Sequence, residues 1–250
     1  MIIRKSRSEL ELMREANRIV ARVLDRLGEL VEPGVSTASL NSEAEKMIED
    51  AGGNPVFKGY RGFPAGICAS INNEVVHGIP AKDRIVREGD ILSVDVGVRY
   101  KGFCGDSART YPVGKIDSKL SSLLEVTREA LLLGIEKAVS GNRLTDISAA
   151  VQGCVEKNGF SVVRDFVGHG IGRSLHEDPQ VPNFGKPGRG PLLKEGMVLA
   201  IEPMVNTDGA GVRVLDDEWT VVTEDGGYSA HFEHTIAITS QGPWILSDSN

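Results

Sequence analysis

The segment REGDILSVDV at residues 87–96 has a counterpart 107 positions later, where residues 194–203 read KEGMVLAIEP. Glu, Gly and Leu are shared, and Asp95 of the first segment aligns with Glu202 of the second. An apolar run that ends on an acid at the same place in both copies indicates two similar halves, with a site between them near the equivalent acids.

The same offset aligns Pro33-Gly34 with Ser140-Gly141, and Gly52 with Gly159. Each half is predicted to hold two helices followed by antiparallel strands, which gives one pseudo-symmetric α+β domain over residues 1–250, with repeats of about 1–115 and 116–250. Helices are expected from the capping boxes at residues 6–11 to Pro33, then over 37–51, 118–139 and 145–158. Strands are expected within 91–113 and, as VLAIEPMV, VRVLDDEWTVVT and HFEHTIAIT, within 197–246.

Residues 91–113 are predicted to form a hairpin around RYKG. Asp95 and Asp106 are equally far from a centre between Tyr100 and Lys101, so regular pairing places them directly opposite each other on one face; a bulge at Gly102 would shift the register by one residue. Two carboxylates this close repel by about 4 kcal/mol at an effective dielectric constant of 20. They need a proton or a cation between them unless both are solvated on an exposed face.

Three more side chains favour a cation. Glu202 follows a run too apolar for an exposed strand, and alternation in AHFEHTIAIT places Glu233 on the face opposite Phe232 and His234. His169 adds a nitrogen donor. Four carboxylates and one imidazole exceed the needs of a single tetrahedral zinc ion, so the sequence predicts two divalent ions bridged by carboxylates, with Mn, Fe, Co or Zn as candidates.

All five histidines of the chain lie near these predicted elements, which favours a site over isolated structural histidines. They are His77, His169, His176, His231 and His234.

Residues 167–179 read VGHGIGRSLHEDP. The glycine spacing matches neither GxGxxG nor a P-loop, and His176-Glu177 lacks the second histidine of an HExxH motif. We interpret the glycines as allowing the backbone to approach the substrate closely.

Bulk composition excludes several classes. A net charge of −7 argues against direct nucleic-acid binding. Three cysteines without a CxxC pair argue against a disulfide framework, and no apolar run has the length of a signal peptide core or a membrane span. We therefore expect a cytoplasmic protein without membrane contact.

The motifs GYRGFPAGICASINNEVVHGIP, DVGVRYKGFCGDSART, GHGIGRSLHEDPQV, IEPM and FEHT resemble those of the methionine aminopeptidases of the short bacterial, type I form, which have the pita-bread metallopeptidase fold. The resemblance covers nearly the whole chain. It implies a curved antiparallel sheet covered by helices. It further implies that Asp106 and Glu233 bridge two ions, that Asp95 holds one ion, and that His169 and Glu202 hold the other.

The resemblance also implies the substrate contacts. His77 and His176 correspond to the histidines that flank the substrate peptide. Two pocket positions differ from the family pattern: Phe57 stands where a smaller residue is common, and Leu175 stands where Phe is common. These differences alter the shape of the pocket but leave the metal ligands unchanged. The implied methionine pocket comprises Phe57, Tyr60, Phe63, Cys68, Leu175 and Trp219.

The implied activity is removal of the N-terminal methionine from nascent proteins and peptides that have a small second residue, by attack of metal-activated water on the first peptide bond. Glu202 would transfer the proton from that water to the leaving amine, His176 would donate to the carbonyl oxygen, and His77 would hold the scissile amide or assist the leaving nitrogen. The implied partners are nascent polypeptide N-termini, with the ribosome as a place of contact, and we expect a monomer.

Three other functions are compatible with parts of this pattern. Proline-specific aminopeptidases and prolidases carry similar ligands but usually have an additional N-terminal domain. Catalytically inactive binding modules of the same fold typically lose ligands, whereas this chain has all five. A dinuclear phosphoesterase would need a phosphate-binding arginine cluster, which the sequence does not show.

Overall fold

A computed structural model describes residues 1–248, so the last two residues of the expected second repeat lie outside the described part. The helices are α1 (Arg7–Leu30), α2 (Thr37–Asp50), α3 (Ser118–Glu136) and α4 (Leu144–Lys157), with a 3₁₀ turn η1 (Tyr60–Gly62). The strands of the first half are β1 (Asn54–Pro55), β2 (Ile67–Ile71), β3 (Glu74–Val76), β4 (Ile91–Tyr100) and β5 (Phe103–Pro112). The later strands are β6 (Ser161–Val162), β7 (Gly168–Gly170), β8 (Glu177–Val181), β9 (Val198–Ile201), β10 (Met204–Asn206), β11 (Val212–Val214), β12 (Val221–Thr223), β13 (Ser229–His231), β14 (His234–Thr239) and β15 (Gly242–Ile245).

The helices form where the sequence predicts them. The α1 helix begins with the capping box of Ser6 and Glu9, in which the Ser6 hydroxyl accepts from the Glu9 N–H and the Glu9 carboxylate accepts from the Ser6 N–H. Its apolar stripe from Leu10 to Leu27 is buried. The observed ends of α1 and α3 each fall three residues before the predicted limits, because the final turns are not helical.

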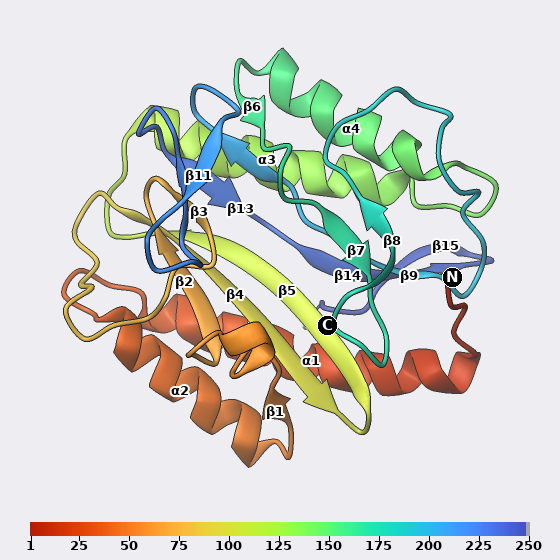
Figure 1. The fold of residues 1–250 in the computed structure, drawn as a ribbon, viewed down its shortest axis with the longest axis horizontal. Coiled ribbons are helices and arrows are strands. Elements are labelled where there is room, and N and C mark those ends of the chain that lie inside the picture. The colour runs from red at the N-terminus through yellow and green to blue at the C-terminus, as the bar shows by residue number, and fades with distance from the viewer. Residues whose placement is uncertain (249–250) are drawn as a thin grey trace.

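The helices lie on the outside and the strands between them. Figure 1 shows α1 and α2 along one side, α3 and α4 along the other, and the long curved strands β4 and β5 between them. The β4 strand pairs with β1, β2 and β5, and a five-stranded sheet runs in the order β15-β14-β9-β7-β8, with antiparallel pairing throughout both sheets. The predicted α+β class, with antiparallel sheet covered by helices, is confirmed.

The backbone repeats the 107-residue offset. The bounds of α2 and α4 differ by that offset, and so do the isolated bridges Ser36–Ile85 and Arg143–Leu192. Aligned glycines adopt the same left-handed conformation, with φ of 98° at Gly34 and 99° at Gly141. The repeat in the sequence therefore records equivalent turns as well as equivalent strands.

The hairpin register differs from the sequence prediction. Lys101 and Gly102 form a two-residue turn with φ of 49° and 81°, so Tyr100 pairs with Phe103 and the register shifts. Asp95 then lies opposite Ala108, and Asp106 lies opposite Gly97. The two acids are diagonal neighbours on one face, so the predicted direct pairing was wrong and the shared face was right.

Three predicted strands are interrupted. VRVLDDEWTVVT forms the hairpin β11–β12, because the Asp217 carboxylate accepts from the Trp219 and Thr220 N–H groups and closes a turn. VLAIEPMV breaks between β9 and β10 at Glu202-Pro203, and HFEHTIAIT breaks between β13 and β14 at Phe232-Glu233.

The last two breaks lie side by side. Met204 pairs with His231 on one side, and Ile201 pairs with His234 on the other, so the register continues through the gap. That register places Glu202 across from Glu233, and one backbone hydrogen bond, from the Phe232 N–H to Pro203 O at 3.3 Å, follows it within the break. The directly opposed acids of this fold are therefore Glu202 and Glu233.

No helix within residues 1–248 is long and apolar enough to cross a membrane.

Candidate metal centre and substrate pocket

One cavity of about 660 Å³ between the two halves contains every predicted site residue. Residues from distant parts of the chain meet there, among them the strands of the first hairpin and the strands around the paired breaks. The predicted residues in its wall are Phe57, Tyr60, Phe63, Cys68, His77, Asp95, Asp106, His169, Leu175, His176, Glu202, Trp219 and Glu233.

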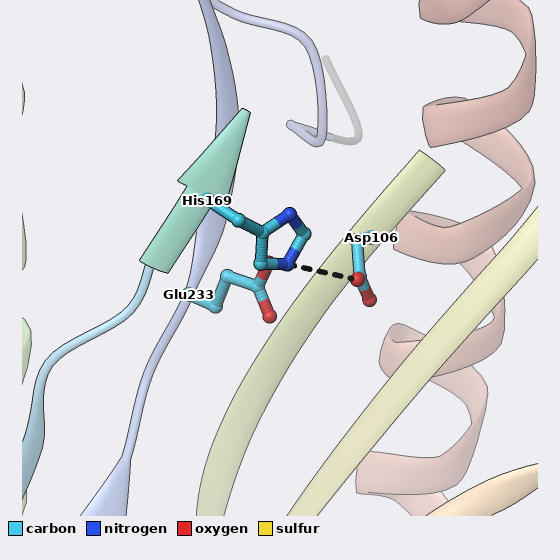
Figure 2. A group of neighbouring side chains, drawn as sticks. All are labelled: Asp106, His169 and Glu233. Carbon is cyan, nitrogen blue, oxygen red and sulfur yellow. Dashed lines mark ion pairs between the residues drawn. The ribbon is translucent and has the colours of Figure 1, made fainter. Parts of the chain in front are cut away.

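The charged end of the cavity holds the carboxylates and His169. Figure 2 shows Asp106, His169 and Glu233 pointing toward one another from β5, β7 and the segment before β14. His169 Nε2 lies 3.8 Å from Asp106 Oδ2 and 3.5 Å from Glu202 Oε1. Asp106, His169 and Glu233 are all buried, at 4%, 7% and 2% exposure.

Backbone contacts fix the carboxylates in place. The Glu233 N–H donates to Ala108 O, and the Ser107 hydroxyl donates to Glu233 O, which ties the break beside β14 to β5. The buried Asn17 side chain on α1 accepts from the Asp106 N–H at 3.2 Å. Gly97 lies opposite Asp106, and its lack of a side chain lets Phe57 and Val56 pack against the hairpin there, because a Cβ at Gly97 would overlap both.

The donor atoms fit a divalent cation. Buried Asp95 Oδ1, Asp106 Oδ1 and Glu233 Oε1 have no hydrogen-bond partner among the residues described. The separations of 3.5–3.8 Å around His169 are too long for hydrogen bonds, yet close to the spacing of two donors that each lie about 2.0–2.2 Å from one shared ion. Buried carboxylates without partners carry a large desolvation cost, which a cation removes.

Burial shifts the pKa of each group toward its neutral form. It raises the pKa of Glu202 to about 8 and that of Asp95 to about 7, and raises the pKa values of Asp106 and Glu233 well above the usual range, with further increases at the last two from neighbouring carboxylates. Burial also lowers the pKa of His169 to about 3, so its imidazole is neutral and available to a metal.

His231 is a cavity residue to which the sequence analysis gave no role. It is 2% exposed, and its Nε2 lies 3.6 Å from Glu202 Oε2 without a hydrogen bond in the described chain. Its side chain joins those of Glu202 and Glu233 in a group able to hold a metal ion. Strand alternation contained the signal, since His231 and Glu233 are two residues apart and thus share a face.

His234 lies apart from the site. Its Nδ1 is hydrogen-bonded to the Ser247 hydroxyl at 2.8 Å, and its side chain lines a separate groove beside Arg109 and Arg128. The other four histidines line the cavity, whereas His234 lies outside it, in agreement with the predicted alternation that places His234 on the face opposite Glu233.

The apolar end of the cavity is enclosed by aromatic and sulfur-bearing side chains. Phe63 and Trp219 pack edge to face with centroids 5.1 Å apart, and Cys68 is 4% exposed. His77 lies at the boundary with the charged end, 5.9 Å from the Trp219 ring, in a left-handed conformation with φ of 61°. Such strain in a non-glycine residue is typical of functional positions.

The glycines of the GHGIG segment serve the fold. A Cβ at Gly168 would overlap Ala200 O, and one at Gly170 would overlap Asp178 O, so both allow close approach of neighbouring strands. A Cβ at Gly172 would overlap the Lys5 side chain. The close approaches that these glycines permit are within the protein, which corrects the interpretation that they admit the substrate.

A buried ion pair supports the loop that carries His176. Lys5 Nζ lies 2.6 Å from Glu177 Oε2, with side chains 4% and 9% exposed, and Glu177 Oε1 accepts from the Ser174 N–H. The N-terminal segment thus holds the loop in place through the ion pair of Lys5 with Glu177.

Replacing Lys5 by Met should lower the free energy of unfolding by about 3–5 kcal/mol, because it leaves Glu177 buried without a counter-charge. The matched control is Lys101→Met, which breaks an ion pair of similar length (2.7 Å to Glu15 Oε2) whose side chains are 50% and 42% exposed. That control should change stability by less than about 1 kcal/mol. Denaturant unfolding measures the free energy of unfolding of both variants. Equal decreases in the two variants would show that burial does not determine how much each ion pair contributes to stability.

Comparison with known proteins identifies the family. The model of metallopeptidase family M24 matches residues 11–240. The chain belongs to family M24. A protein named methionine aminopeptidase from Clostridium acetobutylicum is 54% identical over 247 residues, which cover 99% of both chains. The crystal structure of methionine aminopeptidase from Thermotoga maritima superimposes with a TM-score of 0.98 at 47% identity, covering 99% of this chain and 100% of that one.

A more distant solved structure shares the fold. Prolidase from Pyrococcus furiosus gives a TM-score of 0.81 at 21% identity, and this chain covers 66% of its length. The M24 chain is therefore a metallopeptidase with a pita-bread fold, and its carboxylate and histidine cluster supports the use of divalent metal.

The raised carboxyl pKa values predict a stability that depends on pH and metal. Above pH 6.5 most histidines are neutral in the unfolded chain as well as in the folded one. The buried carboxyls of the metal-free M24 chain keep protons that the unfolded chain has lost, until the pH passes their raised pKa values, so stability falls as pH rises through about 7 and 8. Between pH 6.5 and pH 8.5 the Tm of the metal-free protein should fall by about 5 °C or more. Below pH 6.5 the buried neutral histidines oppose this trend.

Thermal melts with chelator and with Mn²⁺ measure this effect. Metal should raise the Tm most at pH 8.5, because the ion replaces the protons. A metal-free Tm that is flat or rising over this interval would contradict the assignment.

Proposed function

We propose that this M24 chain removes the N-terminal methionine from proteins and peptides. The observation that carries the proposal is the joining of a closed apolar pocket to a carboxylate and histidine cluster in one cavity. The 54% identity over the full length with a protein named methionine aminopeptidase supports the same activity.

Two divalent ions are proposed at the charged end, with Co, Mn, Fe or Zn as candidates. Asp106 and Glu233 would be shared by the two ions, Asp95 would hold one of them, and His169 with Glu202 would hold the other. The unpartnered oxygens of Asp95, Asp106 and Glu233 support this assignment. When bound, the ions supply Lewis acidity that lowers the pKa of coordinated water toward neutrality.

The chain's own residues then position the peptide and move protons. Glu202, with a pKa raised to about 8 by burial before metal binds, is the proposed acceptor of the water proton and its donor to the leaving amine. His176 is the proposed donor to the scissile carbonyl oxygen. His77, whose pKa burial lowers to about 4, is the proposed neutral partner of the scissile amide.

The apolar end is proposed to hold the methionine side chain. Its flexible thioether suits walls of aromatic rings and sulfur, here Phe63, Trp219 and Cys68. Phe57 and Leu175, at 8% and 3% exposure, complete the wall and set its shape. A small second residue is the proposed preference. Nascent polypeptide N-termini in the cytoplasm, including those at the ribosome, are the proposed partners of a monomeric enzyme.

A metal-reconstitution assay tests this function. Metal-free protein is loaded with Mn, Fe, Co or Zn and given Met-Ala and Met-Gly peptides, with Met-Leu as the poor substrate. Methionine release that requires metal and is abolished by chelator is expected. Cleavage before proline with no methionine release would favour the prolidase alternative, whereas binding that is indifferent to chelator would favour an inactive binding module.

A further inference from the structure

The Tyr60 ring lines the proposed methionine pocket, whereas its hydroxyl points toward His176. Tyr60 Oη lies 2.8 Å from His176 Nδ1, and the two rings are tilted by 43° with centroids 5.3 Å apart. Within residues 1–248 this is the one hydrogen bond of the Tyr60 side chain. The hydroxyl of a Tyr that lines a pocket usually finds a hydrogen-bond partner, and here that partner is the residue proposed to contact the substrate carbonyl oxygen.

The backbone around Tyr60 holds this hydroxyl in position. Gly59 and Arg61, on either side of Tyr60, have φ of 82° and 49°, and the Gly59 N–H donates to Phe63 O at 2.8 Å. The tight turn η1 thus fixes the Tyr60 ring at a conformational cost, since Arg61 is not a glycine. Strain at this turn is consistent with a functional demand on the residue that it presents.

The hydrogen bond also determines which nitrogen of His176 remains for the substrate. If the Tyr60 hydroxyl donates to Nδ1, a neutral imidazole carries its proton on Nε2 and can donate to a carbonyl oxygen. If Nδ1 instead carries the proton, Nε2 is an acceptor and cannot donate. His176 lines the cavity with its ring 4.3 Å from that of His169. Among the described residues Tyr60 is the only hydrogen-bond partner of its side chain, so no second partner fixes the tautomer.

We propose that Tyr60 is a positioning residue for catalysis, whose hydroxyl donates to His176 Nδ1 and holds the ring in the Nε2–H tautomer that hydrogen-bonds the scissile carbonyl oxygen. The inference rests on the proposed function of His176 as that donor. It gives Tyr60 two separate roles, with the ring packing against methionine and the hydroxyl acting through His176.

Tyr60→Phe tests the hydroxyl alone, because the ring stays in place. We expect kcat to fall about tenfold, with KM changed less than about twofold and bound metal unchanged. Phe57→Leu is the matched pocket variant, which should act mainly on KM. A Tyr60→Phe effect confined to KM would overturn the proposal.

A double-mutant cycle separates a positioning role from a general structural one. In the His176→Ala background, Tyr60→Phe should have no further effect on kcat, because the partner through which it acts is absent. Phe57→Leu should keep its effect on KM in that background. An undiminished loss of kcat from Tyr60→Phe without His176 would overturn the proposal.

A spectroscopic measurement is independent of activity. Ring ¹⁵N chemical shifts of His176, assigned by their loss in His176→Ala, should show an unprotonated Nδ1 and a protonated Nε2 in the wild-type chain, with and without zinc. Tyr60→Phe should give a mixture of tautomers. A wild-type Nδ1–H tautomer would overturn the proposal, whereas a failure to release methionine with the expected tautomer in place would count against the proposed function instead.

Discussion

Asp106→Ala should abolish activity and metal binding together. The replacement removes a buried carboxylate that lies 3.8 Å from His169 Nε2 and has an oxygen without a partner in the described chain. Loss of a ligand shared by both proposed ions should lower kcat/KM by about a thousandfold or more, which corresponds to roughly 4 kcal/mol of transition-state stabilisation. Elemental analysis should show fewer ions per chain than in the wild type.

The same variant should remain folded. Burial and neighbouring carboxylates raise the pKa of Asp106, so its removal relieves repulsion, and the metal-free variant should be at least as stable as the metal-free wild type at pH 8. Asp25→Ala is the control, because Asp25 is a half-exposed partner of Arg109 on the outer side of the hairpin. Full activity and two bound ions in Asp106→Ala would refute the assignment of this residue.

His176→Ala should separate turnover from metal binding. If the imidazole donates to the carbonyl oxygen as negative charge develops, its loss should lower kcat by about 10²–10³-fold, the usual cost of one such donor. The metal content should not change, because the proposed partner of His176 is the substrate carbonyl oxygen and not a metal ion. Peptide hydrolysis and metal analysis on one preparation measure both quantities.

His234→Ala is the matched histidine control. His234 is bonded to Ser247 and faces away from the cavity, so its replacement should leave kcat within about twofold and lower stability by about 1 kcal/mol. Loss of metal from His176→Ala in proportion to activity would show that His176 is a ligand and that its role here is misassigned.

The fold class followed from patterns that act locally. The helices appeared where capping and apolar spacing predicted them, as at Ser6 and Glu9, because those signals operate within one or two turns. The 107-residue repeat was readable because Gly34 and Gly141 need the same left-handed backbone, and equivalent turns constrain equivalent residues.

Most residues of the candidate site could also be predicted from the sequence, because acids within apolar strands are unusual. Asp95, Asp106, Glu202 and Glu233 stood out for that reason, and together with His169 they line one cavity. His231 was passed over because a histidine beside a candidate ligand has no distinctive pattern of its own until its burial and its distance to Glu202 are known.

The sequence by itself determined which residue types are present, the order of the helices and strands, and the face to which each acid points, because these depend on periods of two and 3.6 residues. Only the tertiary structure decided register and proximity. The two-residue turn at Lys101-Gly102 made Asp95 and Asp106 diagonal neighbours, while paired breaks brought Glu202 and Glu233 directly across from each other. Register depends on turn geometry and on pairing between distant strands, and neither is set by the local alternation that the sequence displays.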